Sequence, residues 1–145
     1  MTLRFRKAVE ADCEFCYLVR ELAFREYAER VRGWDEERER ANHRTRFASQ
    51  DFQVIQSEGL DVGILSAETT PDALKIFQLF ILPEHQGKGI GSSCMEHLIQ
   101  EATQLRIPLR LQVINGNDRA LSFYKRYGFQ HVGKTKTHIQ LERPS

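Results

Sequence analysis

A glycine-rich loop constrains this chain most, because it lies between an apolar run and a helical pattern. It occupies residues 77–93, FQLFILPEHQGKGIGSS, with glycine at positions 87, 89 and 91. Residues 78–82 predict a buried strand, which Pro83 ends because proline donates no ladder hydrogen bond. From Ser92 the spacing of apolar residues predicts a helix, whose apolar face contains Met95, Leu98, Ile99, Ala102 and Leu105.

A strand, a glycine-rich turn and a helix start together can form an anion site. The first N–H groups of a helix have no intrahelical acceptor, and the helix dipole places partial positive charge there. Glycine also allows the backbone to approach a ligand closely. We therefore interpret the loop as a diphosphate-binding site. The alternative is a turn that caps the helix and binds nothing.

Two familiar phosphate loops do not fit these residues. The P-loop ends in Gly-Lys-Ser/Thr, whereas Lys88 is followed by Gly89. The dinucleotide fingerprint is G-x-G-x-x-G, whereas this loop reads G-x-G-x-G, and residues 107–111 offer no acidic ligand for a ribose. The loop therefore belongs to neither class.

Two blocks of the sequence resemble the GNAT acyltransferase superfamily. The spacing Gln86-x-x-Gly89-x-Gly91 is similar to its acetyl-CoA loop, Gln/Arg-x-x-Gly-x-Gly/Ala. Residues 117–129, NDRALSFYKRYGF, are similar to its second hallmark, in which Asn, Ala, Tyr and Gly-Phe follow in order. The match covers residues 75–133, and the N-terminal half matches only in its order of elements. Two motifs in the right order are more specific than one loop.

This resemblance implies acetyl-CoA as the acyl donor and no metal. The loop would hold the diphosphate through main-chain N–H groups, and the backbone of Phe80 and Ile81 would pair with the pantetheine arm as an added strand does. A main-chain N–H near Ile81 would stabilise charge on the thioester oxygen. The implied cofactor-binding residues are Phe80, Ile81, Gln86, Gly87, Lys88, Gly89, Ile90, Gly91, Ser92 and Asn117.

Tyr124 is the predicted general acid. A phenol of pKa ~10 can protonate a leaving thiolate whose thiol has a pKa of ~8.5. The alternative is that Tyr124 packs on the apolar face of its helix. Asn117, at the start of that helix, can cap it or bond the cofactor. The general base stays open among Glu68, His85, His138 and an ordered water.

The resemblance further implies that two helices of the N-terminal half form a wall of the acceptor site. Tyr27, Trp34 and Asp35 are therefore candidates for substrate binding. A carboxylate there would attract an ammonium group, and an aromatic ring could hold it by a cation–π contact. The alternatives are that Asp35 caps the second helix and that Trp34 fills core.

The remaining patterns predict an α/β fold in a single domain, residues 1–145. The order of elements, β-α-α-β-β-β-α-β-α-β-β, implies a mixed sheet with helices on both faces. The resemblance implies a GNAT-like sheet that is mostly antiparallel, with about seven strands and about four helices. The first helix should bury Phe15, Leu18, Val19, Leu22 and Ala23, and residues 27–33 should break it. Further strands are expected at residues 3–6, 52–57, 60–67, 109–114, 129–133 and 135–141.

Composition narrows the partners. A net charge of +1, from 21 basic and 20 acidic residues, favours neither nucleic acid nor an anionic membrane. No stretch approaches the roughly 20 apolar residues of a membrane span, and the N-terminus lacks an apolar signal core. Three cysteines leave one unpaired in any scheme, which suggests the cytoplasm. Cys13 and Cys16 fall within a predicted helix, so we interpret them as structural rather than as a redox pair.

The predicted function is N-acetyltransfer from acetyl-CoA to a primary amine, by direct attack in a ternary complex. The acceptor is expected to be a small-molecule or peptide amine, without nucleic acid or membrane as a partner, and a homodimer stays open. One alternative is a catalytically silent module that binds acyl-CoA. Another is an acyltransferase that uses a different acyl donor or acceptor.

Overall fold

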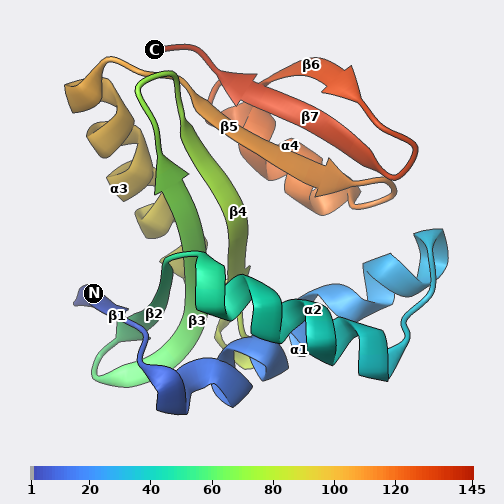
Figure 1. The fold of residues 1–145 in the computed structure, drawn as a ribbon. Coiled ribbons are helices and arrows are strands. Elements are labelled where there is room, and N and C mark those ends of the chain that lie inside the picture. The colour runs from blue at the N-terminus through green and yellow to red at the C-terminus, as the bar shows by residue number, and fades with distance from the viewer. Residues whose placement is uncertain (1) are drawn as a thin grey trace.

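The computed structural model describes residues 2–145, whose strands form one mixed sheet in the order β1-β2-β3-β4-β5-β7-β6 (Figure 1). Every neighbouring pair is antiparallel except β4 and β5. The strands are β1 (Leu3–Lys7), β2 (Phe52–Ser57), β3 (Leu60–Thr69), β4 (Leu74–Ile81), β5 (Leu109–Ile114), β6 (Gln130–Lys134) and β7 (His138–Arg143). The helices are α1 (Cys13–Val31), α2 (Glu36–Ser49), α3 (Ile90–Leu105) and α4 (Asp118–Arg126), with short 3-10 turns at Glu10–Asp12 and Pro83–His85. The predicted fold class is confirmed.

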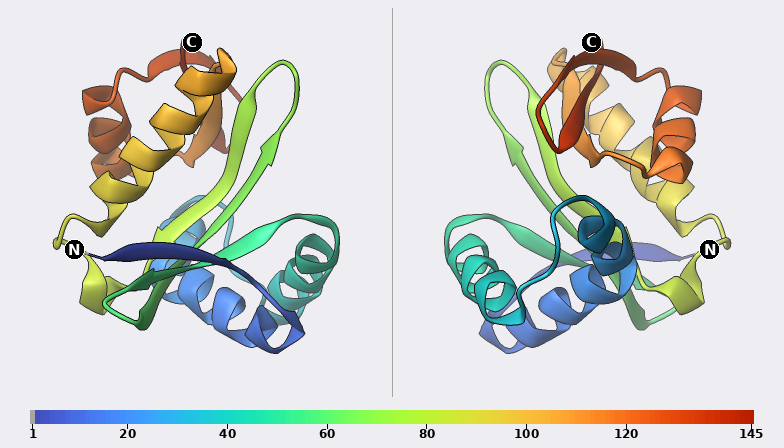
Figure 2. Two further views of the ribbon diagram at one scale, coloured as in Figure 1. Left: turned by 90° about the vertical axis from the view of Figure 1, so that its left-hand side faces the viewer. Right: turned by 90° about the vertical axis from the view of Figure 1, so that its right-hand side faces the viewer.

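The helices cover both faces of the sheet, as predicted. Helices α1 and α2 lie on one face, and α3 and α4 lie on the other (Figures 1 and 2). The larger apolar core fills the α3/α4 face, where Met95, Leu98 and Ala102 of α3 are buried. A smaller core on the α1/α2 face joins Cys16 and Val19 of α1 to the sheet. Cys16 is therefore a structural residue, and Cys13, Cys16 and Cys94 are free thiols.

Helix α1 differs from its prediction in length and in its buried face. It continues without a break to Val31, because nothing in residues 27–31 prevents helical geometry. Leu18 and Leu22 are 43% and 55% exposed, so the predicted face is wrong at these two positions. The buried face instead includes Tyr17 and Arg20, since α1 packs against α2 as well as against the sheet.

The centre of the sheet opens because β4 and β5 diverge (Figure 1). The two strands pair only at their beginnings, Leu74 with Leu109 and Lys75 with Arg110. Beyond these pairs β4 stays paired with β3 as far as Ile81, and β5 stays paired with β7. One edge of each central strand is therefore left without a neighbouring strand, and this opening positions the candidate site.

The remaining element boundaries shift by a few residues. Helix α3 begins two residues before its predicted start, and β4 begins four residues before its own. The predicted hairpin turn is confirmed, with Glu58 and Gly59 at φ values of 52° and 79°. Among the helices of residues 2–145, none is both long enough and apolar enough to cross a membrane.

Candidate active site

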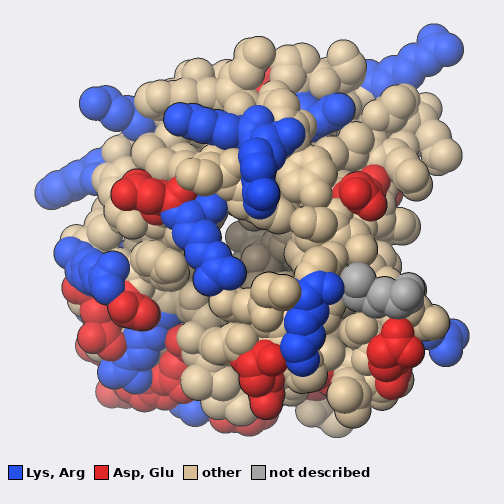
Figure 3. Space-filling view, turned by 180° about the vertical axis from the view of Figure 1, so that it is seen from behind, with Lys and Arg blue, Asp and Glu red and all other residues tan. Residues whose placement is uncertain are grey.

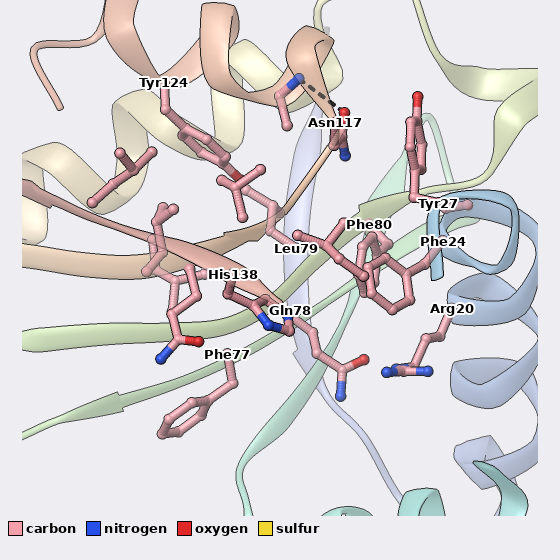
Figure 4. Close-up of a pocket in the computed structure, with 18 of the residues that line it drawn as sticks. Arg20, Phe24, Tyr27, Phe77, Gln78, Leu79, Phe80, Asn117, Tyr124 and His138 are labelled. Atoms are coloured by element: carbon pink, nitrogen blue, oxygen red, sulfur yellow. Dashed lines mark hydrogen bonds between the residues drawn. The ribbon is translucent and has the colours of Figure 1, made fainter. Parts of the chain in front are cut away.

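A cavity of about 1370 Å³ is lined by residues from both faces of the sheet and by the two diverging strands. At one end it is lined by Gln86, Gly91 and Arg119, and at the other by residues of α1 and α2. Tyr124 and His138 also line the cavity (Figure 4). The opening in the sheet therefore connects the glycine-rich loop to the helix pair.

The glycine-rich loop has the backbone geometry of an anion site. Gly87 and Gly89 have φ values of 75° and 84°, which glycine adopts without strain. Gly89 is the N-cap of α3, and the Ser93 N–H makes the first bond of the helix, to the Gly89 carbonyl at 3.0 Å. The N–H groups of residues 90–92 consequently have no intrahelical acceptor. These donors suit a diphosphate.

Side chains of the loop have different surroundings from one another. Gly87, Lys88 and Gly89 are exposed, and Ser92 is half-buried at the start of α3. Ile90 is buried in the core. Its side chain is therefore unavailable to a cofactor, and only its main-chain N–H can serve the predicted role.

Gln86 and Arg119 tie the loop to the rest of the site. The Gln86 amide nitrogen donates to the Ile81 carbonyl at 2.9 Å, and Arg119 donates to the Gln86 side-chain oxygen at 3.4 Å. Sequence analysis missed Arg119, whose signal was a basic side chain two residues after Asn117. The face shown in Figure 3 is hollowed, and Lys and Arg side chains gather around the hollow. This charge suits a polyanionic ligand.

The backbone of Phe80 does not face the opening, although it was predicted to pair with the pantetheine arm. The Leu82 N–H donates to the Val62 carbonyl at 2.8 Å. Because ladder bonds alternate along an antiparallel strand, Phe80 also bonds to β3, whereas Leu79 and Ile81 direct their backbone groups into the opening. The Phe80 ring instead lines the cavity beside Phe24, with ring centroids 5.4 Å apart.

Tyr124 packs in the core and also lines the cavity. Its ring packs against Phe123 and Phe129, with centroids 5.2 and 5.3 Å away. Its hydroxyl points into the cavity (Figure 4). Burial alone raises the pKa of Tyr124 to about 12. The phenol therefore stays protonated across the neutral pH range and can donate a hydrogen bond.

Asn117 caps α4 and also lines the cavity. Its side-chain oxygen accepts from the Ala120 N–H at 3.1 Å, shown as the dashed line in Figure 4. This bond fixes the orientation of the amide. The Asn117 amide nitrogen is left available to a ligand in the cavity.

His138 is the one candidate base that lines the cavity. Glu68 is exposed and lies opposite Lys75 in the β3–β4 ladder, and His85 lies in the turn after β4. Burial lowers the pKa of His138, and the positive charges of two arginines, Arg32 and Arg20, lower it further. Its imidazole is therefore neutral at pH 7 and able to accept a proton.

The three predicted acceptor residues are separated by the structure. Tyr27 lines the cavity, whereas Trp34 and Asp35 are not among its lining residues. The Asp35 carboxylate accepts from the Arg38 N–H at 3.0 Å and so caps α2. The Trp34 ring lies 5.4 to 6.0 Å from three guanidinium groups, those of Arg20, Arg25 and Arg32. The cation–π partners of Trp34 are thus side chains of the protein itself.

Gln78 is a cavity residue that sequence analysis treated as part of an apolar strand. Its side chain is 7% exposed and lines the cavity. A polar residue inside a buried strand was the available signal. No group of three or more His, Cys, Asp or Glu side chains that could hold a metal occurs within residues 2–145.

Comparisons with known proteins identify a family and related folds. The model of the acetyltransferase (GNAT) family matches residues 14–129. The [ribosomal protein bS18]-alanine N-acetyltransferase of Escherichia coli is 28% identical over 100 residues. That match covers 68% of this chain and 66% of the relative, so it spans just under two thirds of the relative's length.

Solved structures share the fold at lower identity. The PaiA N-acetyltransferase of Thermoplasma acidophilum, in complex with coenzyme A, has a TM-score of 0.79 at 17% identity and covers 100% of both chains. An acetyltransferase from Thermus thermophilus has a TM-score of 0.79 at 21% identity, covering 100% of this chain and 98% of the other.

Proposed function

The chain belongs to the GNAT acetyltransferase family, and we propose that it transfers an acetyl group from acetyl-CoA to a primary amine by direct attack in a ternary complex. One observation carries this proposal: the opening between β4 and β5 joins the glycine-rich loop on one face of the sheet to the helix pair on the other. A donor bound at the loop and an acceptor bound at the helices would therefore meet inside the sheet.

Main-chain groups would hold the donor. The N–H groups at the start of α3 would bind the diphosphate, with Arg119 and the Asn117 amide nearby. The backbone of Leu79 and Ile81 would pair with the pantetheine arm along the free edge of β4. The Ile81 N–H would then lie beside the thioester oxygen and stabilise negative charge on it.

Two side chains on opposite faces would move the protons. His138 Nδ1 lies 2.7 Å from the Thr137 hydroxyl oxygen. In the tautomer whose Nδ1–H donates to that oxygen, Nε2 is free to take a proton from the amine. The amine nitrogen then forms a C–N bond with the acetyl carbonyl and the C–S bond breaks. Tyr124 would donate its hydroxyl hydrogen to the departing sulfur.

A thiol-release assay over a panel of primary amines tests this function. We expect release of free coenzyme A that depends on both acetyl-CoA and an amine. Acetyl-CoA binding, measured separately by calorimetry, is the control for a folded donor site. Tight binding without release for any amine would favour a silent acyl-CoA-binding module. Faster release from longer acyl-CoAs would point to a different donor.

We also propose a class of acceptor and a cellular compartment. The bacterial relative is named for the alanine of a ribosomal protein, so a peptide amine belongs in the panel beside small amines. The three free thiols support a reducing compartment such as the cytoplasm. Burial raises the pKa of both Cys16 and Cys94 to about 12, which makes these thiols unreactive.

A further inference from the structure

Two buried polar atoms without hydrogen-bond partners lie in the acceptor half of the cavity. One is the side-chain oxygen of Gln78, an acceptor, and the other is Nη1 of Arg46, a donor. Both residues line the cavity. Since buried polar groups are nearly always paired, each of these atoms calls for a partner. A ligand with one donor and one acceptor would satisfy both.

A chain of contacts brings the two residues to the same place. Gln78 on β4 pairs with Ser66 on β3. The Ser66 hydroxyl donates to the Gln50 side-chain oxygen at 3.1 Å, and Gln50 follows Arg46 by one helical turn at the end of α2. Gln50 lines the cavity as well. Gln50 therefore links the strand that carries the unpaired acceptor to the helix that carries the unpaired donor.

The charge around Arg46 favours an anion. Glu39 is a shared partner of two arginines, with its oxygens 2.8 Å from Arg20 and 3.0 Å from Arg32. In residues 2–145, no acidic side chain forms an ion pair with Arg46. At this end the cavity lining contains four arginines and two glutamates, which leaves an excess of positive charge: Arg20, Arg32, Arg38, Arg46, Glu26 and Glu39. Burial lowers the pKa of Arg20, and the charge of Arg46 lowers it further.

We infer that the acceptor is an amino acid, a primary amine that also carries a carboxylate. Arg46 would bind the carboxylate, and the Gln78 oxygen would accept a hydrogen bond from the amine. Gln78 and His138 both line the cavity, and in Figure 4 the Gln78 side chain extends toward Arg20. An amine bound by Gln78 would therefore share the cavity with the proposed base. This inference rests on the proposed function for its chemistry, and it reverses the expectation that an acidic residue attracts the substrate.

Matched pairs of acceptors test the carboxylate directly. Each pair consists of an α- or ω-amino acid and its amide, which differ in charge but hardly in size. We expect kcat/KM to be about tenfold or more higher for the acid in at least one pair, because a hydrogen bond to a charged group is lost in the amide. A series from glycine through β-alanine to 4-aminobutyrate reports the separation between the two binding positions.

The Arg46→Met variant identifies the residue responsible. It should abolish the preference for the acid, because kcat/KM for the acid should fall about tenfold or more relative to kcat/KM for the amide. Arg44→Met is the matched control, because Arg44 is exposed on the same helix and lines a separate small cavity. Arg44→Met should keep the preference. Thermal unfolding of both variants checks that the fold is intact.

Carboxylate binding separates failure of this inference from failure of the proposed function. Butyrate and valerate, which have no amine to acetylate, should perturb the amide resonances of Gln78 and its neighbours in the parent and in Arg44→Met but not in Arg46→Met. Such binding without any acetyl transfer would support the carboxylate site and contradict the proposed transferase activity. Equal use of acids and amides, or carboxylate binding that survives Arg46→Met, would overturn the inference. A preference for 2-aminoethylphosphonate over β-alanine would also overturn it.

Discussion

The two faces of the sheet are held together in different ways. On the α3/α4 face, apolar side chains form the larger core, and the proposed donor contacts come mostly from main-chain N–H groups. On the α1/α2 face the apolar core is smaller, and buried Arg20, Glu39 and His43 contribute polar contacts. A site built from main-chain groups depends on backbone shape, whereas a site built from side chains depends on which residues stand at each position. We therefore expect the α3/α4 face, which we call the donor face, to bind acetyl-CoA. We expect the α1/α2 face, which we call the acceptor face, to determine which amine is used.

The largest effect is expected from a substitution of Tyr124, on the α3/α4 face, because it should slow the chemical step. Tyr124→Phe keeps the ring packing and removes the hydroxyl. We expect kcat to fall on the order of 10²-fold or more, with acetyl-CoA affinity nearly unchanged. Steady-state kinetics and calorimetry measure the two quantities. A variant as active as the parent would leave Tyr124 with a packing role alone.

The pH dependence of kcat/KM tests whether His138, on the acceptor face, acts as the base. Because the pKa of His138 is lowered below its usual 6.5, its imidazole is neutral above that pH and becomes protonated as the pH falls through the lowered pKa. We expect kcat/KM to be level near pH 7 and to fall about tenfold per pH unit in the acid range. His138→Gln should lower the rate and remove this acid limb. An unchanged acid limb in the variant would assign the proton to water or to another group.

A substitution in the loop tests whether the donor face acts through its backbone. Gly89 has φ of 84°, so Gly89→Val should cost about 1–2 kcal/mol of stability through backbone strain. We expect acetyl-CoA affinity to weaken about tenfold, since the backbone N–H groups would be displaced. Calorimetric titration of the folded variant is the measurement. Unchanged affinity would make the loop a helix cap without a ligand.

The smallest effect is expected at Asp35, where the structure shows a helix cap. Asn caps nearly as well as Asp, so Asp35→Asn should change neither stability nor either KM by more than a small factor. Asp35→Ala is the control and should cost about 1 kcal/mol of stability. A raised KM for the amine alone in Asp35→Asn would return this carboxylate to the acceptor site.

The comparison of the faces also explains what the sequence could predict. The loop at residues 86–92 and the helix after Asn117 were predicted because their features are local: spacing, glycine and capping residues. The positions of the strands along the chain were predicted from alternation or from apolar runs, which are also local features. The proposed acceptor residues Gln78 and Arg46 are 32 positions apart, and only folding brings them together. The cation–π partners of Trp34 were also not predicted, because folding brings the arginines beside its ring from α1 and from the residue that follows α1.

The hydrogen-bonding pattern of β4 is another feature that the sequence could not predict. Which backbone groups of β4 face the opening depends on which residues bond to β3. The sequence does not show which of the two alternating sets bonds, so it did not predict that the backbone groups of Leu79 and Ile81, and not those of Phe80, face the opening. The opening itself depends on how few residues of β4 and β5 pair, which is a property of the assembled sheet.

Amide hydrogen exchange with and without acetyl-CoA tests most directly whether the donor is bound by the backbone of one face. We expect acetyl-CoA to slow exchange at residues 90–92 and at Leu79 and Ile81. We expect no change in the amides of α1 and α2, where we propose that the acceptor binds. Slowed exchange confined to α1 and α2, with none at the loop or at β4, would contradict the division of the site between the two faces.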